Sequence, residues 1–111
     1  MAAGSYNFTL EQGSTFSREI TVQESGSAMN LTGYSTRMQM RSTHDASTIA
    51  LTFTAAVSNA AQGKLNLSAT ATQTAAVEEG IYVYDLEIES GAGVVTRLME
   101  GKVTVTPEVT R

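Results

Sequence analysis

Apolar and polar residues alternate along nearly the whole of this sequence, and that alternation is what most constrains its fold. The clearest example is YSTRMQMR at residues 34–41, where Tyr34, Thr36, Met38 and Met40 share one face. A period of two is the pattern of a half-buried β-strand, whereas helical periodicity is nearly absent from the chain. The sequence therefore predicts an all-β protein.

Seven segments of this kind, separated by turns rich in Gly and Ser, span the 111 residues. That length suits one domain and not two, so we expect a single β-sandwich domain over residues 1–111. The strand number and turn spacing match an immunoglobulin-like antiparallel sandwich. The side chains of the first six strands predicted to face the core are Tyr6, Phe8, Leu10, Phe16, Ile20, Val22, Tyr34, Thr36, Met38, Met40, Ile49, Leu51, Phe53, Leu65, Leu67, Tyr82, Tyr84, Leu86 and Ile88.

The seventh predicted strand is VVTRLMEGKVTVTP at residues 94–107. It contains Gly101 in its middle and ends at Pro107. A glycine inside a strand weakens it and permits a kink, so we predict a bulge at Gly101. Residues 55–63, AAVSNAAQG, are predicted to be a connection between strands.

One short helical turn is expected in TATQTAAVEEG at residues 70–80. Thr70 or Thr72 would cap its first turn, because a Thr hydroxyl accepts from the free backbone N–H groups there. The apolar residues Ala75, Ala76 and Val77 would pack inward, and Gly80 would end the turn.

Tyr82 supports the immunoglobulin-like prediction. In such sandwiches a Tyr near the start of the sixth strand hydrogen-bonds back to the preceding corner. Tyr82 has that place in GIYVYDLEIES at residues 80–90, just after the predicted helical turn. Tyr84 stands where antibody domains carry a Cys, but this chain has neither Cys nor Trp. The prediction therefore rests on strand number and the Tyr82 corner, not on a disulfide.

Charged residues alternate with the apolar ones in two of the predicted strands. Arg37 and Arg41 lie on the outer face of the third strand, and Asp85, Glu87 and Glu89 lie on that of the sixth. The third and sixth strands are neighbours in an immunoglobulin-like sandwich. Opposite charges on neighbouring strands attract, so we interpret these residues as a charge-matched sheet face and not as a catalytic pair of carboxylates.

The overall charge and composition exclude several classes of partner. The net charge is −4, and an acidic protein gains no counterion release from nucleic acid. We therefore expect neither nucleic acid nor anionic membranes as partners. No apolar stretch approaches the ~20 residues of a membrane span. Residues 1–12 lack the basic region and apolar run of a signal peptide, so synthesis in a cytoplasm is expected.

No combination of residues points clearly to catalysis, a metal or a cofactor. His44 is the only histidine, and its sequence neighbour Asp45 would not orient its ring unless the loop folded back. An exposed loop histidine is the favoured interpretation. Glu78 and Glu79 have no metal-ligand spacing, and no Gly-rich loop precedes a helix. We therefore predict a protein that is not an enzyme and holds no metal or cofactor.

Two features are candidates for a protein interface. Ile81 and Val83 lie on the outer face of the sixth predicted strand, where an apolar spot marks an interface. Partial cover by side chains of the last strand is the alternative. The second candidate is the strand edge from Tyr6 through Phe8 to Leu10, which offers backbone groups for pairing.

Residues 25–41, SGSAMNLTGYSTRMQMR, resemble a pattern of tailed-bacteriophage virion proteins: a turn with Gly, a dLTGyt step and a strand ending in Arg. The chain is similar to the amino-terminal immunoglobulin-like domain of phage upper baseplate proteins. The similarity extends to EQGSTFSREITV at residues 11–22, GIYVYDLEI at 80–88 and VVTRLMEGKVTVTPEVTR at 94–111, and so covers most of the chain from Tyr6 to Arg111. These motifs are structural and include no catalytic residues.

The resemblance implies a structural protein of a phage virion, made in the host cytoplasm, that binds other virion proteins and symmetric copies of itself. A tail, baseplate or fibre-adaptor protein is the first expectation. A capsid-decorating cement protein is the alternative within the same class. A glycan-binding module on the virion surface is an alternative from another class, and an exposed aromatic cluster would favour it.

Overall fold

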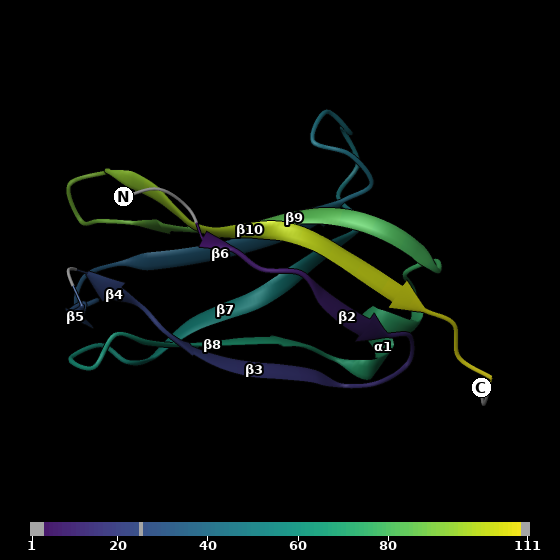
Figure 1. The fold of residues 1–111 in the computed structure, drawn as a ribbon, viewed down its shortest axis with the longest axis horizontal. Helices are drawn as coiled ribbons and strands as arrows, with labels where there is room; N and C mark the ends of the chain where they lie inside the picture. The colour runs from purple at the N-terminus through teal and green to yellow at the C-terminus, as the bar shows by residue number, and fades with distance from the viewer. Residues whose placement is uncertain (1–3, 25, 110–111) are drawn as a thin grey trace.

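The computed structural model describes residues 4–24 and 26–109, which contain ten β-strands and one short helix (Figure 1). The strands are β1 (Gly4–Ser5), β2 (Phe8–Glu11), β3 (Phe16–Thr21), β4 (Gln23–Glu24), β5 (Ser27–Ala28), β6 (Ser35–Arg41), β7 (Leu51–Asn59), β8 (Lys64–Ala69), β9 (Gly80–Glu89) and β10 (Val95–Thr106), and the helix is α1 (Ala71–Ala75). Strands β1, β4 and β5 have two residues each, and the others are longer. The prediction of an all-β protein is confirmed.

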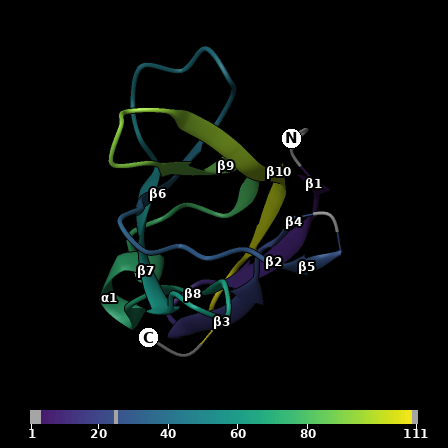
Figure 2. The same ribbon diagram turned by 90° about the vertical axis from the view of Figure 1, so that its left-hand side faces the viewer.

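Eight of the strands form one curled sheet in the order β1-β10-β9-β6-β7-β8-β3, with β2 also paired to β10. Strands β4 and β5 pair separately. The sheet turns over at β7, because residues 51–53 pair with β6 and residues 54–59 pair with β8. Figures 1 and 2 show the result: β6, β9 and β10 lie on one side of the core, and β3 and β8 lie on the other.

Strand β7 corrects one prediction about the connections. Residues 55–59 belong to this strand, although they were expected to lie outside any strand. The period of two continues through them, since Ala55 and Val57 are half-buried while Ala56 and Ser58 are exposed. Small residues obscured the alternation, and only pairing with β8 makes this stretch a strand.

The core fills the space between the two halves of the curled sheet. Most of the side chains predicted to face inward are buried or half-buried there, and Ile49 is the clearest exception. Ile49 is 41% exposed because it lies in the loop before β7, where the alternation does not yet apply. The buried apolar residues are Phe8, Leu10, Val22, Leu31, Met38, Met40, Leu51, Phe53, Leu65, Leu67, Ala69, Val77, Tyr84, Leu86, Ile88, Val103 and Val105.

Aromatic rings fill the seam between β2 and β3, which lie at the two ends of the curled sheet (Figure 2). The Phe8 ring stacks on Phe16 with centroids 5.2 Å apart and meets Tyr84 edge-on at 5.0 Å. Arg18 of β3 lies over this cluster, with its guanidinium carbon 5.5 Å from the Tyr6 centroid and 5.7 Å from the Phe16 centroid. Cation–π attraction therefore helps to hold β2 against β3.

Residues 4–11, here called the amino-terminal arm, lie along the free edge of β10. Strands β1 and β2 both pair with β10 in parallel. Between them, the Tyr6 amide donates to the Glu100 carbonyl at 2.9 Å and Asn7 Oδ1 accepts from the Lys102 amide at 2.9 Å. The first residues of the described chain are thus held against the last strand.

Gly101 makes this close approach possible. A Cβ at Gly101 would collide with the Tyr6 carbonyl oxygen and lie 2.7 Å from Asn7 Oδ1. The predicted bulge at Gly101 is wrong, since Gly101 pairs in register with Tyr84 and the register shift lies between Arg97 and Met99. The glycine is needed for contact with another stretch of backbone and not for a kink.

The Tyr84 hydroxyl also holds the arm, donating to the Tyr6 carbonyl at 2.5 Å. Burial raises the pKa of Tyr84 to about 12, with a smaller opposing effect of Arg18. Because the folded pKa exceeds the ordinary value of about 10, Tyr84 stabilises the fold fully below pH 10, and this contribution is lost as pH rises through about 12.

We therefore expect the free energy of unfolding to fall between about pH 10 and 12, and to fall less in Tyr84→Phe. Urea unfolding of both proteins across this range checks the prediction. Every other titrating group is common to the two proteins, so the difference between their profiles isolates Tyr84. Parallel profiles would contradict the assignment.

The helical turn forms where it was predicted, but its inward face differs. Thr70 is the N-cap, accepting from the Gln73 amide, and the Gln73 side chain accepts in return from the Thr70 amide. Val77 is buried as predicted, whereas Ala75 and Ala76 are exposed. Thr74 is buried in their place, because its hydroxyl donates to the Ser14 carbonyl at 2.8 Å.

The corner before β9 has the expected tyrosine contact. The Tyr82 hydroxyl donates to the Glu78 carbonyl at 2.8 Å, so the ring reaches back over the turn that follows α1. Gly80 does not end the helix, which stops at Ala75; it is instead the first residue of β9. This contact fixes the angle at which the chain enters β9.

Candidate functional site

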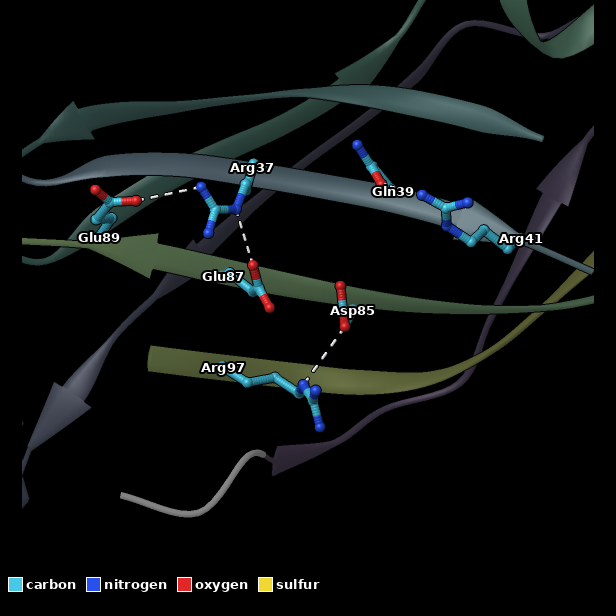
Figure 3. A network of polar contacts seen from close by, with 7 residues as sticks. All are labelled: Arg37, Gln39, Arg41, Asp85, Glu87, Glu89 and Arg97. Carbon is cyan, nitrogen blue, oxygen red and sulfur yellow. Dashed lines mark hydrogen bonds and ion pairs between the residues drawn. The ribbon is translucent and has the colours of Figure 1, made fainter. Parts of the chain in front are cut away.

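The outer face of β6, β9 and β10 carries most of the charged side chains of this half of the sheet (Figure 3). The registers place Arg37 opposite Glu87 and Gln39 opposite Asp85 across β6 and β9. Across β9 and β10, Glu87 lies opposite Arg97. Alternation within each strand turns these side chains away from the core, so they stand side by side on the outer face.

Arg37 makes the cross-strand ion pairs predicted for the outer face. Its Nε lies 2.8 Å from Glu87 Oε1, and its Nη1 lies 3.2 Å from Glu89 Oε1. The hydrogen bond and charge of Glu87 raise the pKa of Arg37, with a smaller contribution from Glu89. The prediction of a charge-matched face is confirmed for these three residues.

Among the described residues, Arg41 has no carboxylate partner. Its guanidinium donates to the carbonyls of Ala46 at 2.8 Å and Ser47 at 3.0 Å, and to Gln39 Oε1 at 3.1 Å. The register explains the difference, since Arg41 lies opposite the apolar Val83 at the end of β6. Arg41 therefore holds the loop between β6 and β7, which projects at the top of Figures 1 and 2.

Arg97 of β10 is a member of this face that the sequence analysis did not identify. Its Nε lies 3.4 Å from Asp85 Oδ2, and its Nη1 lies 4.0 Å from Glu100 Oε2. In a regular strand Arg97 and Glu100 would point to opposite faces. The register shift between Arg97 and Met99 adds one residue, which brings both side chains onto the outer face.

A hollow of about 250 Å³ lies on this face, between the strands and the β6–β7 loop. Carboxylates and arginines both line it, together with Val83 and the exposed His44 of the loop. Its charged residues are Arg37, Arg41, Arg97, Asp85, Glu87 and Glu100. We take this hollow as the candidate site because charged side chains from three strands converge on it.

Asp85 lies at the centre of the charges around this hollow. Burial is the largest effect that raises its pKa, and the charges of Glu87 and Glu100 raise it further. Arg97 and His44 act in the opposite direction. The net result is a carboxyl group that gives up its proton less readily than an ordinary aspartate.

The raised pKa predicts that Asp85→Asn is more stable than the native protein at pH 7, because ionised Asp85 is disfavoured in the folded state. The folded state binds the Asp85 proton more tightly than the unfolded state does. Protonated Asp85 therefore stabilises the native protein below the ordinary aspartate pKa, and this contribution is lost as pH rises through the folded pKa. Urea unfolding at pH 3 and pH 7 checks the sign. A variant that is less stable at pH 7 would show that the Arg97 ion pair outweighs burial.

The predicted interface residues lie in two different settings. Ile81 is 66% exposed and Val83 is half-buried beside the hollow, both on the outer face of β9. Tyr6 is 40% exposed under Arg18, whereas Phe8 and Leu10 are buried in the core. For Phe8 and Leu10, only the backbone edge of β2 is therefore left to meet a partner.

The residues considered for chemistry are not brought together as a group. Among residues 4–24 and 26–109, no cluster of three or more His, Cys, Asp or Glu side chains could hold a metal ion. His44 lines the hollow together with Asp85 and slightly lowers the pKa of that carboxyl group. The sequence could not reveal this placement, because it depends on the conformation of the β6–β7 loop.

No protein-family model matches this chain, and a search of curated proteins finds no match either. Within the described part of the chain, no helix is long and apolar enough to cross a membrane. The candidate site therefore has to be interpreted from its own geometry.

Proposed function

We propose that this chain is a non-enzymatic structural protein of a tailed-phage virion that acts by packing against other virion proteins in the tail, baseplate or fibre adaptor. One observation carries the proposal. Three of the four segments that resemble phage baseplate domains, residues 25–41, 80–88 and 94–111, supply the adjoining strands β6, β9 and β10, and the fourth, residues 11–22, supplies β3. Most of the resemblance thus falls on three neighbouring strands, whose outer face bears the hollow and the exposed Ile81.

The proposal includes an immunoglobulin-like sandwich as the fold. Three pairings support it: the third and sixth long strands, β6 and β9, are neighbours; β3 pairs with β8; and β2 pairs in parallel with the last strand, β10. The contact from Tyr82 to Glu78 adds the tyrosine corner typical of such domains. Such a sandwich presents two sheet faces and its strand edges for assembly.

The virion role is tested by measuring the copy number of the chain in gradient-purified phage particles with quantitative mass spectrometry. Copies in small multiples of three or six are expected for a tail or baseplate protein. Hundreds of copies that scale with the major capsid protein would favour a decoration protein. Absence from particles would contradict the proposal.

A glycan-binding role has less support from the surface. Sugar-binding sandwiches present a cluster of exposed aromatic rings, and Tyr6 is the only aromatic among the large exposed apolar side chains of the described residues. Its ring is stacked 6.0 Å from that of Phe8 and lies under Arg18. Protein packing is therefore the function we propose.

A further inference from the structure

We propose that the amino-terminal arm of one copy of this chain docks on the β10 edge of a second copy, so that neighbouring copies in an assembly exchange arms. The inference rests on the proposed function for the closeness of the copies, since a tail or baseplate protein is present as symmetric neighbours. Exchange of an identical segment is a low-cost route to association, because each copy makes the same contacts as before.

The β10 edge fits the sequence of the arm. Gly101 leaves room for the Tyr6 carbonyl, which a Cβ at residue 101 would obstruct. Asn7 Oδ1 accepts from a β10 amide at 2.9 Å, while Phe8 and Leu10 are buried in the core. These contacts depend on the arm's own side chains as well as on its backbone. The arm of a second copy is therefore the partner that matches this edge.

The arm is bound mainly by parts of the chain that are distant in sequence. Strands β1 and β2 pair with β10 and with no other described strand. Gln12 continues this binding, since its amide donates to the Thr106 carbonyl at 3.1 Å. Its side chain donates to the Val77 carbonyl at 2.8 Å and accepts from the Glu108 amide at 3.0 Å. Every folded copy presents these groups, whichever arm binds them.

The link between the arm and the rest of its own copy is short and local. In the described part of the chain, no backbone hydrogen bond joins β2 to β3, and these two strands contact each other through side chains. Gly13, Ser14 and Thr15 form the hinge between them. Gly13 has a φ of 82°, and Ser14 and Thr15 are exposed. One turn bond spans the hinge, from the Ser14 amide to the Glu11 carbonyl at 3.1 Å, so opening it breaks few contacts that a second copy does not restore.

The concentration of copies decides between a closed chain and an exchanged one. A segment on a short flexible linker has an effective concentration on the order of millimolar at its own site. Neighbouring copies compete for that site when their concentration reaches the same range. We therefore expect arm exchange among crowded copies and closed single copies in dilute solution.

The test uses engineered cysteines, because the natural chain has none. Thr9 and Thr104 are exposed and paired across β2 and β10, and paired residues have Cα atoms about 4.8 Å apart, within disulfide range. Thr9→Cys and Thr104→Cys copies are mixed in urea, refolded together at about 2 mM and oxidised. The matched control replaces Thr104→Cys with Thr52→Cys, an exposed position of β7 that pairs with β6. We expect at least about tenfold more interchain disulfide from the first mixture than from the control.

Equal disulfide yields from the two mixtures would reflect chance collisions and would overturn the inference. The double variant Thr9→Cys/Thr104→Cys, refolded alone at about 20 μM, should close the bond within one chain. Failure to close would also contradict the inference, since the arm would then not lie beside β10. Either negative result leaves the virion location standing, because particle composition tests that location separately. Conversely, absence of the chain from particles would contradict the virion role and leave the measured arm exchange unchanged.

Discussion

Replacing Gly101 with Ala is expected to destabilise the protein by about 2–3 kcal/mol, because the added methyl group collides with the Tyr6 carbonyl. The amino-terminal arm would have to move off the edge of β10. Strand propensity alone predicts the opposite sign, since Ala in a strand is favoured over Gly by roughly 0.5–1 kcal/mol. Urea unfolding of the variant therefore distinguishes the two explanations by the direction of the change.

Gly4→Ala is the matched control for this prediction. Gly4 lies in the same arm, but a Cβ there would be 3.7 Å from the Leu98 carbonyl, which is an ordinary contact. We expect its stability to stay within about 0.5 kcal/mol of the native protein. If Gly101→Ala were as stable as Gly4→Ala, the close packing of the arm on β10 would be refuted.

Truncating Phe8 to Ala should lower the free energy of unfolding by about 3–5 kcal/mol. Phe8 is 8% exposed, and its ring contacts those of Phe16, Phe53 and Tyr84 with centroids 5.0–6.1 Å apart. The substitution leaves a cavity at the seam where the two ends of the curled sheet meet. Denaturant unfolding at neutral pH gives the value directly.

Thr9→Ala provides the comparison for Phe8→Ala, because Thr9 is the next residue of β2 and is exposed. Its change in stability should be within about 0.5 kcal/mol. A loss below about 1 kcal/mol in Phe8→Ala would mean that the arm contributes little to the core. In that case β2 would add little to the packing between the two ends of the curled sheet.

The strands of this protein could be predicted from the sequence because their signal is local. The alternation in residues 34–41 and 80–90 depends only on neighbours in the chain, and it correctly identified β6 and β9 with their inner and outer faces. The ion pairs of Arg37 followed, because the predicted fold made these two strands neighbours. The local alternation and one assumed strand pairing were sufficient to predict both strands and the Arg37 ion pairs.

Features that depend on distant contacts could not be predicted in this way. Within its own strand, Gly101 suggests a bulge. The reason for a glycine there is the amino-terminal arm, whose Tyr6 carbonyl leaves no room for a side chain. The extra residue between Arg97 and Met99 brings Arg97 to Asp85, although strand alternation gives no sign of it. Likewise, Arg41 donates to carbonyls of the β6–β7 loop instead of pairing across the strands, and residues of that loop border the hollow.

The central claim is that the outer face of β6, β9 and β10 packs against another virion protein. Carbodiimide labelling of carboxylates, compared between the free chain and intact particles, tests it most directly. Asp85, Glu100 and Glu19 have side chains 40%, 41% and 54% exposed, so all three should react in the free chain. Asp85 and Glu100 are expected to become protected in particles, while Glu19 of β3 stays reactive. Equal labelling of Asp85 and Glu100 in the two states would contradict it.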